Sequence, residues 1–104
     1  NVNRMPKKNW TIAMNLSVEH NTSAHRFEVV VDGQTCVLEY RLADQVMTIT
    51  HTGVPEQVGG RGIAAELART AFETARVNGW KVVPACSYAS VYITKHPEYA
   101  DLVA

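Results

Sequence analysis

The sequence has no excess of either charge and no long apolar run. Ten lysines and arginines balance ten aspartates and glutamates, so no basic field would attract a phosphate backbone over a distance. No apolar run approaches the roughly 20 residues that a membrane-spanning helix needs, and the N-terminus lacks the pattern of a signal peptide. We therefore expect a soluble, cytoplasmic protein with neither nucleic acid nor a membrane as partner.

Cysteine and histidine are scarce and widely spaced. The two cysteines, Cys36 and Cys86, have no CxxC spacing, and the four histidines are dispersed, so no metal site is predicted. In a reducing compartment both thiols are expected to be free, although the spacing alone leaves a bridge between them open. Cys36 alternates with Leu38 and Tyr40 along the chain and is expected to pack in the core.

The length of 104 residues suffices for one domain with a modest core and is too short for two. Residues 18–104 form the predicted domain. Residues 1–17 show no clean hydrophobic period and are expected to be an N-terminal extension, either tag-derived or disordered.

Three antiparallel strands are predicted in the first half of the domain. The β-forming run FEVVV and the alternating run TCVLEYRL flank the turn signal DGQ, a pattern typical of a hairpin. A second tight connection, ADQ, leads to the run VMTITHTGV, which ends at Pro55. Strict alternation in this last strand would place Met47, Ile49 and His51 on one face.

An amphipathic helix is predicted from Gly62 to Asn78. Its apolar residues follow the i, i+3, i+4, i+7 rule, and Gly79 is well placed to end it at the C′ position. The run WKVVPAC then predicts a short strand interrupted by Pro84, and SYASVYITK predicts a second helix with Ser87 as its candidate N-cap. The order of elements predicts a mixed α/β fold.

Three glycines, Gly59, Gly60 and Gly62, stand at the start of the first helix. Glycine permits a positive φ and lets a ligand approach the backbone closely. The first amides of a helix lack an intrahelical acceptor and lie at the positive end of its dipole. The cluster therefore predicts a phosphate-binding loop, and the simpler alternative is a tight loop that only turns the chain.

Two common phosphate motifs do not fit this loop. The spacing Gly60-x-Gly62-x-x-Ala65 matches the dinucleotide fingerprint, but that fingerprint follows the first strand of a parallel unit and needs an acidic residue about 20 positions later. The preceding strands are predicted to be antiparallel, and no carboxylate stands near Trp80 or Lys81. A P-loop is also disfavoured, because no lysine follows the glycines.

The segment QVGGRGIA instead resembles the Gln/Arg-x-x-Gly-x-Gly/Ala acyl-CoA loop of the GNAT superfamily of N-acetyltransferases, with Gln57, Gly60 and Gly62 at the motif positions. It follows the predicted meander and precedes a helix, which is the order in that family. The stretches HNTSAHRFEVVVDGQ, HTGVPEQVGGRGIA, ARVNGWKVVPACSYA and HPEYADLV also resemble the YjdJ-like group of minimal GNAT domains. This resemblance covers roughly residues 18–103.

The resemblance implies a GNAT-like fold, a twisted, mostly antiparallel sheet flanked by helices. It also implies an enzyme that transfers an acetyl group from acetyl-CoA to an amine, either a small molecule or a protein lysine. Loop amides would hold the pyrophosphate of coenzyme A, and main-chain groups near Val54 would pair with the pantetheine arm. Tyr88 and Tyr92 stand four residues apart on the second predicted helix and could line the acyl pocket or pack on the sheet, and packing is expected for Tyr92. The expected cofactor-binding residues are Val54, Gln57, Val58, Gly59, Gly60, Arg61, Gly62, Ile63 and Tyr88.

Cys86 and His51 are the expected catalytic residues. Cys86 precedes a helix, where amides favour a thiolate, so its sulfur could accept the acetyl group; the alternative is a small buried hydrophobe. His51 ends a strand just before the loop and could deprotonate the amine, because imidazole titrates near neutral pH; the alternative is a structural histidine bonded to the loop. Direct transfer and a two-step route through Cys86 both remain open.

A function of a different class is also compatible with the sequence. The protein could be a non-catalytic acyl-CoA-binding module that acts through a protein partner, because so short a chain leaves little room for an elaborate acceptor pocket. Turnover of acetyl-CoA with a panel of amines distinguishes this module from an enzyme. A monomer or a weak dimer is expected in either case.

Overall fold

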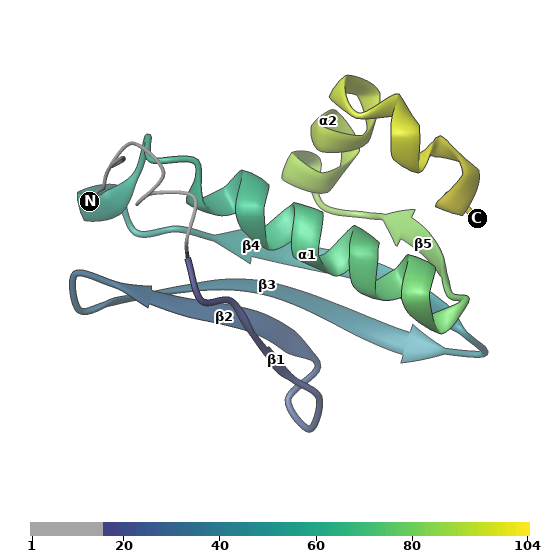
Figure 1. Cartoon of the computed structure of the whole chain (residues 1–104), viewed down its shortest axis with the longest axis horizontal. Coiled ribbons are helices and arrows are strands. Elements are labelled where there is room, and N and C mark those ends of the chain that lie inside the picture. Colours follow the sequence, from purple (N-terminus) through teal and green to yellow (C-terminus); the bar gives the residue numbers. More distant parts are fainter. Residues whose placement is uncertain (1–15) are drawn as a thin grey trace, which may run out of the picture.

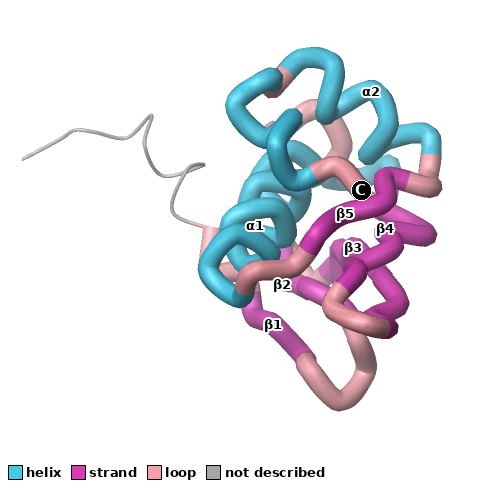
Figure 2. Tube along the Cα trace, turned by 90° about the vertical axis from the view of Figure 1, so that its right-hand side faces the viewer, coloured by secondary structure: helices cyan, strands magenta, loops and turns pink. Residues whose placement is uncertain are grey.

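A computed structural model describes residues 16–104. A five-stranded sheet in the order β1-β2-β3-β4-β5 carries helices α1 and α2 over one face (Figure 1), and Figure 2 shows both helices on the same side of the strands. The elements are β1 (Glu19–Asn21), β2 (Arg26–Val31), β3 (Gln34–Ala43), β4 (Val46–Gly53), the 3-10 turn η2 (Glu56–Val58), α1 (Ile63–Asn78), β5 (Lys81–Pro84), α2 (Ser87–Lys95) and the 3-10 helix η3 (Pro97–Leu102). The predicted mixed fold is confirmed.

Strands β1 to β4 form an antiparallel meander, and β5 joins β4 in parallel. The two predicted tight connections are present, and each has consecutive residues with positive φ: Asp32 and Gly33 in the first, Asp44 and Gln45 in the second. Such turns match the right-handed twist of the strands that they join. Strand β1 was not predicted, because its three polar residues form a strand only through pairing with β2.

A bulge interrupts the pairing of β3 with β4. Tyr40 pairs with Ile49 and Glu39 pairs with His51, so Thr50 is an extra residue on β4. The Thr50 hydroxyl donates a hydrogen bond to the Glu39 carbonyl oxygen at 3.3 Å. An extra residue reverses the alternation of side chains beyond it. The prediction that His51 shares a face with Ile49 is therefore wrong, and His51 is exposed.

The pairing of β4 with β5 ends at Ile49, which lies opposite Pro84. The amides of Ala85 and Cys86 both donate to the Ile49 carbonyl oxygen at 3.0 Å, and the chain then enters α2. Within residues 16–104, the edge of β4 from Thr50 to Gly53 consequently has no strand beside it on the β5 side. Figure 1 shows β5 beside only the first part of β4.

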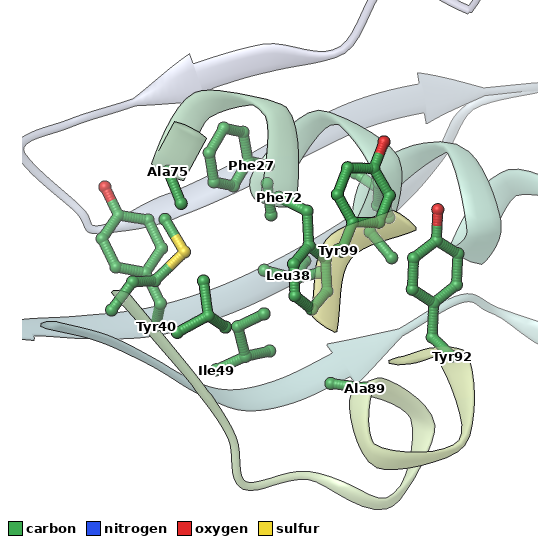
Figure 3. Packing of buried hydrophobic residues seen from close by; sticks show 14 of the residues in the cluster. Phe27, Leu38, Tyr40, Ile49, Phe72, Ala75, Ala89, Tyr92 and Tyr99 are labelled. Atoms are coloured by element: carbon green, nitrogen blue, oxygen red, sulfur yellow. The ribbon is translucent and has the colours of Figure 1, made fainter. Parts of the chain in front are cut away.

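The core lies between the sheet and the helices. Helix α1 buries the apolar stripe predicted for it, and Phe72 stacks against Tyr92 of α2 and Tyr99 of η3, with ring centroids 5.7 and 5.1 Å apart (Figure 3). Cys36 is fully buried, as expected for a packing residue, and both cysteines are free. The amide of Gly79 donates to carbonyl oxygens in the last turn of α1, which confirms the predicted C-terminal end.

The prediction that residues 1–17 form an extension falls almost wholly on residues outside the described part of the chain. Of the two that are described, Leu16 is half-buried and packs against the core. The position of the domain boundary stays a prediction.

The short strand β1 is held by a half-buried histidine. His20 Nε2 lies 2.6 Å from the Tyr40 hydroxyl, and the His20 ring stacks on Phe27 with centroids 4.2 Å apart. Burial, with a smaller contribution from His25, lowers the pKa of His20. The same burial raises the pKa of Tyr40. The packing therefore favours a neutral imidazole.

This contact predicts a loss of stability in mild acid. A histidine in the unfolded chain takes up a proton near pH 6.5, whereas folded His20 takes it up only at lower pH. The contribution is therefore complete above about pH 6.5 and decreases as the pH falls, until the folded form is also protonated. The urea midpoint should fall between about pH 7 and pH 5, and His20→Gln should flatten this fall. A control, His51→Gln, should retain it; equal slopes in wild type and His20→Gln would contradict this account.

Candidate active site

The glycine loop is fixed between two core residues. Val58 is 1% exposed and Ile63 is 2% exposed, whereas Gly59 to Gly62 are exposed. The turn η2 closes the preceding segment, because Val58 donates its amide to the Pro55 carbonyl oxygen at 3.0 Å. Burial of each anchor stabilises the fold by about 1.5–3 kcal/mol. The core thus holds the two ends of an otherwise solvent-exposed loop.

Two of the three glycines have a conformation that favours glycine. Gly60 and Gly62 both have φ of +78°, and a Cβ built at either position meets no atom within 4 Å. Gly59 has an ordinary φ of −66°. The requirement for glycine at 60 and 62 is therefore one of backbone conformation, and the space above these two residues is open.

The loop leaves a run of backbone amides free. Within the described part of the chain, the amides from Gly60 to Ala65 have no hydrogen-bond acceptor, and the first paired amide is that of Glu66, which donates to Gly62 at 3.1 Å. No side chain caps this end of α1. The amides of Val58 and Gly59 are already used within η2. Of the predicted loop residues, the structure therefore leaves amides available from Gly60 onward.

The two polar side chains of the loop are exposed. Arg61 Nη1 lies 2.8 Å from Asp32 Oδ2 at the β2–β3 turn, and both side chains are solvent-accessible. Such a pair contributes little to stability, so the Arg61 guanidinium is available to an anion. Gln57 lies on the surface of η2.

The unpaired edge of β4 lies between the loop and the start of α2. Val54, immediately after β4, is half-buried against the core. On the helix side of this edge, Thr52 Oγ1 lies 3.6 Å from Cys86 Sγ. Thr52 was not predicted as a site residue, because only the bulge at Thr50 turns it to that side.

Cys86 is the N-cap of α2. Its backbone is extended, with φ of −86° and ψ of 156°, and its sulfur accepts a hydrogen bond from the amide of Ala89 at 3.4 Å. The predicted cap at Ser87 is wrong, because the chain is already helical there. The sulfur of Cys86 thus has two polar neighbours, a hydroxyl and a helix amide.

His51 and Cys86 are not brought together. Successive residues of a strand point to opposite faces, so His51 lies on the open face of the sheet and Thr52 lies on the helix side with Cys86. A Cβ built on Gly53 would lie 2.9 Å from His51 Nε2, which shows that the imidazole ring lies over Gly53. The two predicted catalytic groups therefore flank the unpaired edge from opposite sides.

Tyr88 lies on the first turn of α2, half-buried against the core. Its ring centroid is 6.2 Å from that of Tyr92, and burial raises the pKa of its hydroxyl. Tyr92, in contrast, is 5% exposed and packs in the core. The expected packing of Tyr92 is confirmed, and the role of Tyr88 stays a prediction.

Two further properties concern residues 16–104 only. Among them no three or more histidine, cysteine, aspartate or glutamate side chains gather in a way that could hold a metal ion. None of the helices in this region is both long and apolar enough to cross a bilayer.

The family model described as GCN5-related N-acetyl-transferase matches residues 26–102. Since this match covers most of the sequence, the chain belongs to that family of acetyltransferases.

Individual relatives agree with the family assignment. The chain is 31% identical over 85 residues to protein NATD1 of Homo sapiens, an alignment that covers 79% of this chain and 75% of that protein. It is 29% identical over 97 residues to protein NATD1 of Danio rerio, with 88% of each chain covered. The NMR solution structure of a GCN5-like candidate N-acetyltransferase from Staphylococcus aureus superimposes with a TM-score of 0.66 at 28% identity, covering 86% of this chain and 89% of that one. The GNAT-like fold is thereby confirmed.

The loop geometry predicts a matched pair of glycine variants. Gly62→Ala forces an L-residue into φ of +78°, and Gly79→Ala does the same at φ of +73° at the other end of α1. Each should destabilise the fold by roughly 1–2 kcal/mol. Only Gly62→Ala should also weaken the binding of coenzyme A, by about tenfold or more (about 1.4 kcal/mol), because relaxation of the backbone moves the free amides. Isothermal titration calorimetry with coenzyme A measures the affinity of both variants. Equal affinities would mean that the loop only turns the chain.

Proposed function

We propose that this protein transfers an acetyl group from acetyl-CoA to a primary amine. The observation that carries the proposal is the presence of two main-chain surfaces without partners that follow each other closely along the chain, the β4 edge from Thr50 to Gly53 and the amides from Gly60 to Ala65. Unpaired strand edges and helix N-termini both attract main-chain-like or anionic ligands. Acetyl-CoA offers both, as an amide-bearing arm and a pyrophosphate.

The loop supplies the proposed phosphate site. The amides from Gly60 to Ala65 lie at the N-terminal end of α1, where the helix dipole favours negative charge. The exposed guanidinium of Arg61, now paired with Asp32, would add positive charge to this site by exchanging that carboxylate for a phosphate. Val58 and Gly59 would act by shaping the loop, since their amides are already used within η2. Ile63 would contribute its free amide, while its buried side chain anchors the end of the loop.

The β4 edge supplies the proposed site for the pantetheine arm. Its amide groups can pair with β4 as an added strand would, and Val54 continues this edge toward the loop. Tyr88 and Thr52 lie on the helix side of the same opening and would contact the acyl end. Main-chain amides of β4 would polarise the thioester carbonyl.

The arrangement of His51 and Cys86 favours direct transfer. The amine nitrogen forms its bond to the acetyl carbon while the carbon–sulfur bond breaks, and His51 takes the proton that the amine loses. Coenzyme A leaves as the thiolate, which then takes up a proton from solvent or from the protonated His51. His51 lies on the open face, so an amine would reach the thioester from there. The alternative two-step route rests on the position of the Cys86 sulfur, which contacts the Thr52 hydroxyl and the Ala89 amide on the helix side of the opening and could accept the acetyl group there.

One experiment distinguishes these possibilities. Wild type, His51→Ala and Cys86→Ser are incubated with acetyl-CoA and either a polyamine or a lysine peptide, and thiol release is followed. His51→Ala should lower the rate by about 10²-fold or more, the usual effect of losing a general base. Cys86→Ser should retain most of the rate, because serine is also a good N-cap.

The opposite outcomes are equally specific. An acetyl group on the peptide containing Cys86, together with an inactive Cys86→Ser variant, would establish the two-step route. Tight binding of acetyl-CoA with no turnover of any amine would instead support the non-catalytic acyl-CoA-binding module that acts through a protein partner.

A further inference from the structure

Gly53 ends strand β4 without a conformational need for glycine. Its φ is not among the positive values, which occur at Gly33, Gly60, Gly62 and Gly79. Glycine weakens a strand, because it has no side chain to pack and a large entropy to lose, and it often marks a place where another group approaches the backbone. The group that approaches Gly53 is therefore of interest.

That group is the imidazole of His51. The nearest atoms to a Cβ built on Gly53 are all in this ring: Nε2 at 2.9 Å, Cε1 at 3.7 Å and Cδ2 at 3.8 Å. Real Cβ atoms essentially never show a contact under 3.0 Å, so alanine at 53 and the present ring position exclude each other. The ring occupies the space that a side chain at 53 would fill.

The bulge at Thr50 and the missing side chain at Gly53 act on the same residue. The bulge turns His51 to the open face of the sheet. The bare backbone of Gly53 then lets the ring lie along β4 toward the loop, instead of standing away from the strand. Across the sheet, Glu39 of β3 lies directly opposite His51, and Arg26 of β2 lies opposite Glu39.

We propose that Gly53 is a positioning residue, whose lack of a side chain holds the His51 imidazole beside the unpaired edge of β4. This inference rests on the proposed function, in which His51 accepts the proton of the amine. A misplacement of about 1 Å in a catalytic group can lower a rate by about 10²-fold. Gly53→Ala should therefore impair the chemistry while it leaves the fold and the phosphate loop intact.

The direct test combines structure and kinetics. In wild type, a nuclear Overhauser effect should connect the His51 ring protons with the Gly53 α-protons, and Gly53→Ala should shift the His51 ring resonances. Gly53→Ala should lower kcat by about tenfold or more, with an unchanged KM for acetyl-CoA and an undiminished urea midpoint, because a flexible side chain can move aside at little cost.

The control is the same substitution in a protein without the imidazole. In the His51→Ala background, Gly53→Ala should have no further effect on kcat, since the two changes act through one group. The absence of the wild-type Overhauser effect, an unchanged kcat in Gly53→Ala, or an equal loss in both backgrounds would each overturn the proposal. Absence of turnover in wild type would instead overturn the proposed function, which separates the two failures.

Discussion

The candidate site depends on where strand β4 loses its pairing with β5. Two amides, those of Ala85 and Cys86, donate to the single carbonyl oxygen of Ile49, and one residue later the bulge at Thr50 changes the register with β3. The two hydrogen bonds to Ile49 accompany the turn of the chain into α2. The bulge reverses which side chains of β4 face the helices. Together they create an unpaired edge with a thiol on one side and an imidazole on the other. If β4 were paired with β5 along its whole length and had no bulge, it would have no open edge, and His51 would not lie on the opposite side from Cys86.

The core residues on either side of the glycine loop keep its amides without a hydrogen-bond acceptor. A free helix N-terminus would normally acquire a capping side chain, but the N-cap residue of α1 is Gly62, which has no side chain. Val58 and Ile63 are buried on either side, so the loop cannot fold back to satisfy its own amides. The free energy of burial in the core thus maintains amides that have no acceptor within residues 16–104 and that an anion can satisfy, as preorganised sites do in general.

The sequence predicts those features that have local causes. The turn at Asp32 and Gly33, the stripe of α1 and the glycine loop follow from residue types at fixed spacing, and all three are present. Features that depend on pairing between distant residues were missed or wrong. Strand β1 exists only through β2, and the face of His51 depends on one extra residue, Thr50, which a strict period of two cannot show. The N-cap of α2 is Cys86 and not Ser87, because its position depends on where β5 ends its pairing with β4.

The central claim is that the free amides from Gly60 to Ala65 and the open β4 edge form one acyl-CoA site. The most direct measurement is a titration of ¹⁵N-labelled protein with coenzyme A, with adenosine 3′,5′-bisphosphate as a fragment that lacks the pantetheine arm. Coenzyme A should shift the amides of the loop and of Thr50 to Gly53, whereas the fragment should leave the β4 amides unchanged. Shifts confined to another surface, or none at saturating coenzyme A, would contradict the account.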